Sequence, residues 1–222
     1  MKIVNLKERL ERATINVVVY GAAGAGKTSL IRTLQGRVLV ISAEAGLLSL
    51  AGFDADVVEV KNVDDLREVH AFLDKGDHGY DWVCLDSLSE IGEICLLSER
   101  AAHRDVRAAY GALIEKMLGV CRAFRDLPVN VYMSAKEERF KDESTGRLMS
   151  ALSMPGAKLG QQIPYLFDEV LRLVVGKDEE GNVVRALQTS AEPNADAKDR
   201  SGKLDHYEKP DLGAVYAKIM EV

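Results

Sequence analysis

The sequence contains no apolar run that approaches the roughly 20 residues needed to span a bilayer. Its first residues, Met1 to Arg9, lack the uninterrupted apolar stretch and the small-residue cleavage site of a secretory signal. The three cysteines, Cys84, Cys95 and Cys121, form no Cys-x-x-Cys pair and lie in largely apolar segments. We therefore expect a soluble, cytoplasmic protein without membrane contact, disulfides or a zinc site.

An excess of positive charge is also missing. The formal net charge is −6, which argues against uniform attraction to nucleic acid. Residues 100–147 nevertheless contain ten Lys or Arg against seven Asp or Glu, so a modest basic surplus is local. No internal repeat or low-complexity tract occurs, and 222 residues suit one well-buried domain better than two. We therefore expect a single domain over residues 1–222.

What the sequence does contain is a glycine-rich loop in a specific setting. Residues 21–28 read G-A-A-G-A-G-K-T, follow the apolar run 15–20 and lead into a helical pattern. This is a Walker A phosphate loop, in which Lys27 reaches the β and γ phosphates and Thr28 ligates magnesium. The sequence thus predicts bound ATP and Mg²⁺. The predicted phosphate-binding residues are Gly21, Ala22, Ala23, Gly24, Ala25, Gly26, Lys27, Thr28 and Ser29.

Strand and helix patterns alternate along the first part of the chain. Strands are predicted at residues 15–20, 37–42, 57–60, 82–86 and 129–134. Helices are predicted at residues 4–12, 28–35, 62–73, 87–100 and 106–125, the first of these within a leading segment 1–13. This order indicates an α/β fold with a doubly wound, mostly parallel sheet and a ligand at the carboxyl ends of its strands.

The remainder is more irregular. Residues 135–156 are mostly polar and contain Gly146 and Pro155, which predicts a long mobile loop. The patterns that follow predict, in order, a helix at 158–167 bent at Pro164, an antiparallel hairpin of strands 169–175 and 182–189, a polar loop at 191–209 and a final helix ending near Met220.

Two acidic residues stand at predicted strand ends. Asp86 ends the strand 82–86, where a Walker B carboxylate holds the magnesium shell; the alternative is a helix cap, which Ser87 could serve equally well. Glu44 follows the second strand, where a general base could orient or deprotonate the attacking water. The alternative interpretation is that Glu44 is an exposed carboxylate in a loop.

Taken together, several segments resemble the core of the RecA-type ATPases, in matching order and over nearly the whole chain. The match is closest to small phage-encoded RecA-like nucleotide-binding proteins associated with single-strand annealing and recombination. The segments that carry the resemblance are Gly21 to Thr28, Val40 to Glu44, Cys84 to Leu88, Val131 to Lys136 and Ala197 to Gly202.

The resemblance implies roles for four residues. Glu44 matches the glutamate that activates water. Lys136 occupies the place of a Gln or His that senses the γ phosphate; lysine can donate to phosphate but cannot accept from water, and it could instead be a surface residue. Lys198 and Arg200 match a K-x-R element. Its two cations reach across a subunit boundary to the neighbour's γ phosphate. The alternative interpretation of these two residues is a solvated charged turn.

The resemblance also places a DNA-binding loop after Lys136. Cations that could neutralise phosphates, and an aromatic ring that could stack on an unpaired base, occur there among several acidic residues. The candidate DNA contacts are Arg139, Phe140, Lys141, Arg147 and Lys158.

The leading hypothesis is a magnesium-dependent, DNA-stimulated ATPase that forms homo-oligomers on single-stranded DNA, with ATP sites between subunits. Such a protein would assist recombination or strand annealing, with a single-strand DNA-binding protein as a further partner. Two alternatives stay open: a P-loop kinase of a nucleoside or small molecule, and a nucleotide-dependent assembly switch with little hydrolysis. The absence of an N-K-x-D motif argues against a guanine-specific GTPase, and Ala22 and Ala23 argue against a partition-type ATPase.

Overall fold

A computed structural model of the chain describes residues 5–6, 14–44, 46–141, 143 and 146–221. The helix predicted within the leading segment 1–13 falls almost wholly outside these residues. Among the helices that are described, none is both long and apolar enough to cross a membrane.

Strands and helices alternate up to the end of the fifth strand, as the sequence predicts. The strands are β1 Asn16–Gly21, β2 Val38–Ser42, β3 Asp56–Glu59, β4 Trp82–Asp86, β5 Asn130–Lys141, β6 Leu148–Leu152, β7 Glu169–Lys177, β8 Val183–Gln188, β9 Lys198–Asp199 and β10 Tyr207–Glu208. The α-helices are α2 Lys27–Leu30, α3 Val63–Leu73, α4 Leu88–Ala102, α5 Val106–Arg125, α6 Ala157–Gln162 and α7 Leu212–Met220. Short 3₁₀ turns lie at Ile31–Thr33, Leu47–Leu50 and Ile163–Leu166.

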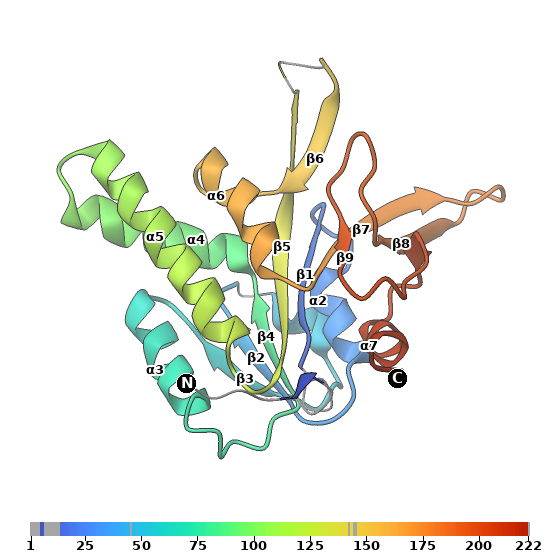
Figure 1. The fold of residues 1–222 in the computed structure, drawn as a ribbon, viewed down its shortest axis with the longest axis horizontal. Coiled ribbons are helices and arrows are strands. Elements are labelled where there is room, and N and C mark those ends of the chain that lie inside the picture. The colour runs from blue at the N-terminus through green and yellow to red at the C-terminus, as the bar shows by residue number, and fades with distance from the viewer. Residues whose placement is uncertain (1–4, 7–13, 45, 142, 144–145, 222) are drawn as a thin grey trace.

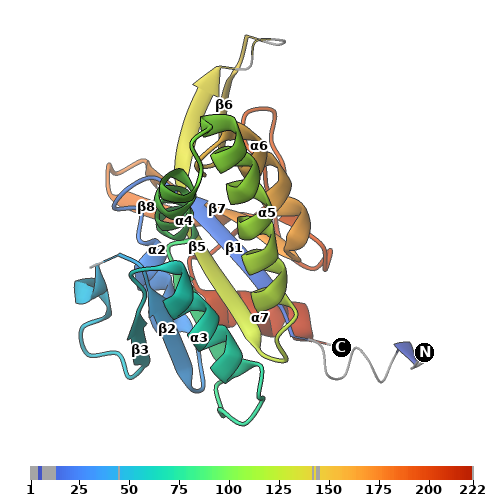
Figure 2. The same cartoon turned by 90° about the vertical axis from the view of Figure 1, so that its left-hand side faces the viewer.

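One sheet organises the described part of the chain. Its order runs β3, β2, β4, β5, β1, β7, β8, β10, and all neighbours from β3 to β7 are parallel. The β7–β8 pair is antiparallel. Helices α3, α4 and α5 cover one face of the sheet, and α2 and α7 cover the other (Figures 1 and 2). This confirms the predicted doubly wound, mostly parallel sheet with a C-terminal antiparallel hairpin.

The central strands contain runs of consecutive apolar residues because both faces of the sheet are covered. In β1, Val18 and Tyr20 belong to the core beneath α3, α4 and α5, whereas Val17 and Val19 belong to the core beneath α2 and α7. Side chains alternate between faces along a strand, so a strand buried on both sides needs consecutive apolar residues. The strand predicted at residues 15–20 is therefore confirmed.

The prediction of a mobile loop at residues 135–156 is wrong. Strand β5 continues to Lys141 and pairs antiparallel with β6, from Glu137 opposite Leu152 to Lys141 opposite Leu148. The two strands form an arm that projects beyond the sheet (Figure 1). The polar composition was misleading because the outer part of this hairpin is exposed, and main-chain ladder bonds do not require apolar side chains.

The polar segment 191–209 is also more ordered than predicted. It contains β9, which pairs with the first residues of β7, and β10, which pairs with β8. The backbone groups of these two short strands are thereby paired with the sheet.

Candidate functional site

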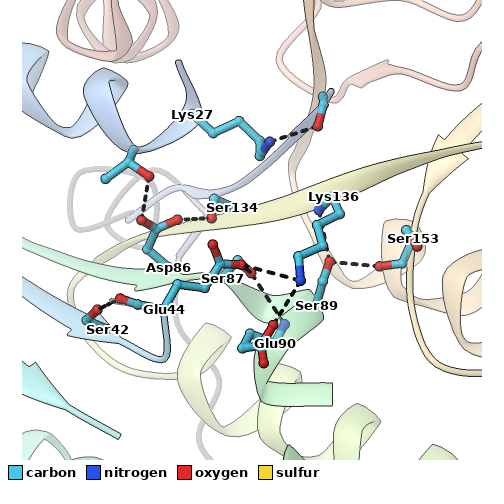
Figure 3. A network of polar contacts seen from close by, with 12 residues as sticks. Lys27, Ser42, Glu44, Asp86, Ser87, Ser89, Glu90, Ser134, Lys136 and Ser153 are labelled. Carbon is cyan, nitrogen blue, oxygen red and sulfur yellow. Dashed lines mark hydrogen bonds and ion pairs between the residues drawn. The ribbon is translucent and has the colours of Figure 1, made fainter. Parts of the chain in front are cut away.

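The carboxyl ends of β1, β2 and β4 meet beside the middle of β5 at one edge of the sheet. Gly21 of β1 lies opposite Lys136 of β5, and Ser42 of β2 lies opposite Asp86 of β4. Glu44 follows β2 at the same edge. These ends surround a cleft of about 590 Å³ whose wall also includes the glycine-rich loop (Figure 3). The cleft is lined by Ala23, Gly24, Gly26, Lys27, Thr28, Ser29, Glu44, Ser49, Asp86, Ser87, Lys136 and Glu137.

The loop conformation depends on its glycines. Gly24 and Gly26 have φ angles of +73° and +109°, which residues with a side chain rarely adopt. Gly21 is needed for a different reason: a Cβ there would lie 2.8 Å from the main-chain oxygen of Leu173. The Tyr132 hydroxyl donates to the Lys27 main-chain oxygen at 2.8 Å and supports the loop from β5.

Lys27 folds back over the loop. Its Nζ donates to the main-chain oxygens of Gly21 at 2.8 Å and Ala22 at 3.0 Å. Burial lowers the pKa of Lys27, while the nearby carboxylates of Asp86 and Glu44 oppose that shift. The ammonium group therefore lies against the phosphate loop, close to the carboxylates of Asp86 and Glu44.

Asp86 is a buried residue of the cleft wall. Its Oδ2 accepts from Thr28 Oγ1 at 2.6 Å and its Oδ1 accepts from Ser134 Oγ. The cap of α4 is Ser87, which accepts from the Glu90 N–H, so the helix-cap alternative for Asp86 fails.

The Thr28 hydroxyl and the Asp86 carboxylate form a pair of hard oxygen donors that suits Mg²⁺. Magnesium is usually held by one or two protein oxygens together with substrate phosphates and water. The described residues contain no cluster of three or more His, Cys, Asp or Glu that could hold a metal ion.

Glu44 lies at the side of the cleft and is partly exposed. Its Oε1 accepts from Ser87 Oγ at 2.5 Å, and the Lys136 Nζ lies 3.7 Å away. The Ser42 hydroxyl donates to the main-chain oxygen of Glu44 at 2.5 Å and fixes the backbone after β2. Glu44 thus belongs to the cleft, where the sequence alone left an exposed loop position equally open.

Lys136 is bound between two carboxylates. Its Nζ lies 2.8 Å from Glu90 Oε2, and its main-chain N–H donates to Ser89 Oγ at 2.9 Å (Figure 3). The hydrogen bond to Glu90 raises the pKa of Lys136, and the charge of Glu44 adds to that shift. Lys136 is therefore a charged group of the cleft.

Several cleft residues were missed by the sequence analysis. Ser134 and Glu90 lie within four residues of predicted positions, so proximity to a strand end was a usable signal. Glu137 directly follows the predicted residue Lys136, but its ion pair with a distant strand could not be seen in the sequence: its side chain is 5% exposed and accepts from Arg172 Nη2 of β7 at 2.8 Å. Burial alone would raise the pKa of Glu137, but hydrogen bonds from Ser150 and Arg172 outweigh burial and lower it.

Lys198 and Arg200 lie away from this cleft. Strand β9 pairs with β7 at Glu169, level with the beginning of β1, whereas the loop follows the end of β1. Lys198 Nζ donates to the main-chain oxygens of Pro164 at 2.8 Å and Phe167 at 2.5 Å. Arg200 Nη1 lies 2.7 Å from Asp168 Oδ1. The structure does not bring either cation to the phosphate loop of the same chain, and action in trans stays a prediction.

The candidate DNA contacts gather around the arm. Arg139, Phe140 and Lys141 are exposed on the outer half of β5, and Arg147 is exposed just before β6. Lys158 is exposed in α6, outside the arm. Arg139 Nε also lies 3.7 Å from Glu137 Oε1, which links the base of the arm to the cleft.

Comparison with known proteins supports a nucleotide-binding ATPase domain. The model of a family described as "AAA domain" matches residues 13–201, which include all six predicted catalytic positions. None of the curated proteins compared with the chain matches it. Among solved structures, the crystal structure of the flagellar accessory protein FlaH from Methanocaldococcus jannaschii is similar, with 10% identity, 82% of each chain covered and a TM-score of 0.46.

Proposed function

This chain belongs to the AAA domain family, and on that premise we propose that it binds ATP with Mg²⁺ and hydrolyses it. The observation that carries the proposal is the meeting of the loop residue Thr28 with Asp86 and Glu44 in one cleft. A phosphate loop, a magnesium-holding carboxylate and a second carboxylate beside the terminal phosphate are the parts that ATP hydrolysis requires.

Each side chain has a defined task in this proposal. The loop N–H groups and Lys27 bind the phosphates, so Lys27 exchanges its two main-chain acceptors for phosphate oxygens. Thr28 and Asp86 would hold Mg²⁺, and Ser134 keeps the Asp86 carboxylate oriented. The metal ion neutralises charge on the β and γ phosphates when it is bound.

Glu44 acts on the attacking water. Its carboxylate is held by the Ser87 hydroxyl, with Lys136 3.7 Å away, so one oxygen is fixed while the group still borders the cleft. A carboxylate in this position can orient the water and accept its proton. Lys136 would contribute positive charge beside the γ phosphate.

A second copy of the chain completes the site. Lys198 and Arg200 lie far from their own cleft, and Arg200 is largely exposed, with its side chain 58% accessible. When copies pack head to tail, these cations would leave their intramolecular partners and reach a neighbour's γ phosphate. This would couple hydrolysis to assembly.

The assembly is proposed to form on single-stranded DNA and to assist recombination or annealing, together with a single-strand DNA-binding protein. Support comes from the arm, where Arg139, Lys141 and Arg147 are exposed with Phe140 among them. Cations can bind the phosphate backbone while an aromatic ring stacks on an unpaired base.

The test is an ATPase assay on purified protein with and without single-stranded DNA, with Lys27→Ala as the inactive control. We expect Lys27-dependent turnover that DNA stimulates, and electron microscopy with an ATP analogue and DNA should show rings or filaments. Absence of nucleotide binding by the unaltered protein would refute the ATPase proposal. Turnover without any response to DNA would refute only the DNA partner.

A nucleotide-dependent assembly switch is the second candidate. The observation that favours it is the position of Lys136, whose charge lies 3.7 Å from the only side-chain group we assign as a base, Glu44. An ammonium group this close attracts the carboxylate and competes with the attacking water for it. Measuring turnover in each oligomeric fraction decides between the two: assembly by ATP without turnover supports the switch.

A further inference from the structure

A second cation reaches the phosphate loop from β8, which lies two strands from β1 in the sheet. Arg185 belongs to β8, and its Nε donates to the main-chain oxygen of Ala25 at 2.9 Å. A Cβ built on Gly26 would have Arg185 Nε at 3.8 Å and Cδ at 4.0 Å as its nearest atoms. The side chain therefore lies directly against the loop, although 160 positions separate Arg185 from Ala25 in the sequence.

The strand register explains how Arg185 arrives there. Leu187 of β8 pairs with Leu173 of β7, and both belong to the core beneath α2. Arg185 pairs with Val175, two positions further along each strand, so these residues point to the same face of the sheet. Arg185 thus occupies the α2 face just beyond the edge of that core, beside the loop that precedes α2.

The guanidinium group of Arg185 has N–H donors that the described residues leave unused. Arginine carries five N–H donors in a rigid fork, and the Nε–H is used by Ala25. In the described part of the chain, the two terminal nitrogens of Arg185 have no hydrogen-bond or ion-pair partner, and the residue is exposed. A fork of this kind binds phosphate oxygens well.

The arrangement of the cleft indicates which phosphate is within reach. Glu44 follows β2, Asp86 ends β4 and Lys136 lies within β5. These three strands all lie on one side of β1, and β7 and β8 lie on the other side. A nucleotide with its terminal phosphate towards Glu44 must run across the loop towards β8. Its α phosphate then approaches the side of the loop that Arg185 contacts.

We propose that Arg185 is a nucleotide-binding residue whose Nε holds the phosphate loop and whose terminal nitrogens bind the α-phosphate end of the polyphosphate. This inference rests on the proposed function of the cleft. It adds a phosphate contact from the C-terminal hairpin, opposite the magnesium side of the site.

The experiment measures the Kd of ADP and of inorganic tripolyphosphate for the full chain and for two variants. Arg185→Gln removes the charge, and we expect it to raise both Kd values about tenfold or more. Arg185→Lys keeps the charge without the fork and should fall between. The difference should shrink as salt screens the charge.

Lys177→Gln is the matched control. Lys177 pairs with Val183 at the outer end of the same hairpin and is exposed. It shares the face of Arg185 but lies two residues further out. Both Kd values should therefore stay within about twofold of the unaltered chain, because Lys177 is an exposed charge to which the described residues offer no partner.

Three results would overturn the proposal. The first is an unchanged Kd in Arg185→Gln. The second is weaker ADP binding with unchanged tripolyphosphate binding, which would assign the contact to the nucleoside. The third is an equal loss at every salt concentration together with a lower melting temperature without ligand, which would make Arg185 a clamp of the loop alone. Failure of the unaltered chain to bind either ligand would instead refute the proposed function.

Discussion

Replacing Arg200 with alanine separates a structural role of this side chain from a role at a neighbour's ATP site. In the isolated chain Arg200 makes one side-chain contact in the described structure, the ion pair with Asp168 at 2.7 Å. Asp168 keeps another partner after the substitution, because its Oδ2 accepts from the Asn16 N–H at 3.2 Å. The fold therefore loses little when the guanidinium is removed.

The two roles predict very different magnitudes. The side chains of Arg200 and Asp168 are 58% and 29% exposed, and pairs this accessible contribute roughly 0.2–1 kcal/mol to stability. For a chain of this size that corresponds to a melting-temperature shift of at most about 2–4 °C. A cation that stabilises phosphoryl transfer in trans is worth about 10³-fold or more in kcat, or roughly 4 kcal/mol.

The assay compares kcat, the Kd of ATP and the melting temperature for Arg200→Ala. We expect near-normal ATP binding and stability with turnover reduced about 10³-fold. Mixing Arg200→Ala with Lys27→Ala should restore activity, because an intact ATP site in one copy then meets an intact Arg200 in the next. With random head-to-tail mixing, about a quarter of the interfaces would be competent.

Normal turnover by Arg200→Ala would refute the trans assignment. So would loss of turnover that mixing does not rescue, since it would indicate damage within one chain. A large fall in melting temperature would show that the ion pair with Asp168 matters more than its exposure implies.

Three other perturbations follow from the structure. Gly21→Ala would place a methyl group 2.8 Å from the Leu173 oxygen, so denaturant unfolding should show a loss of about 1–3 kcal/mol. Burial, with a smaller effect of a neighbouring aspartate, raises the pKa of Glu169 to about 8, from 4.5 for a free group. The folded state then holds the extra proton, so the free energy of unfolding should fall as pH rises from 4.5 to about 8, and Glu169→Gln should flatten that profile. Arg139→Ala with Lys141→Ala should weaken single-stranded DNA binding and lower the slope of log Kd against log salt by about 1.4.

Each of these has a defined contradicting result. Gly46→Ala is the control for Gly21, because a Cβ on Gly46 meets no atom within 4 Å; equal losses in both would refute the steric argument. An unaltered pH profile in Glu169→Gln would show that another group titrates. Lys75→Ala, at an exposed position after α3, is the control for the arm and should leave DNA binding unchanged.

Much of the fold was predictable because the relevant patterns are local. The strand at 15–20 and the loop after it are specified by residues that are neighbours in sequence. The cap of α3 is local too: Asn62 Oδ1 accepts from the Asp65 N–H, and the Asp65 carboxylate accepts from the Asn62 N–H. The arm was not predictable in the same way. Its outer strands are polar, and the pairing of Glu137 with Leu152 is decided by register with a partner strand.

The same distinction between local patterns and tertiary contacts applies to the candidate site. Thr28 and Glu44 follow two strands and Asp86 ends a third. Parallel pairing brings such positions to one edge of the sheet, so their meeting could be expected. The ion pairs of Lys136 with Glu90 and Glu44 were not visible, because they depend on which way α4 and β5 present their side chains.

By itself, the sequence determined a phosphate loop, the alternation of strands and helices, and the acids that end the strands. These are properties of short segments and of the period of their side chains. The tertiary structure alone decided that Arg185 touches the loop, that Arg172 holds Glu137, and that Arg200 pairs with Asp168 away from its own cleft. Contacts of this kind join strands far apart in the chain through sheet order and register, which leave no local pattern to read.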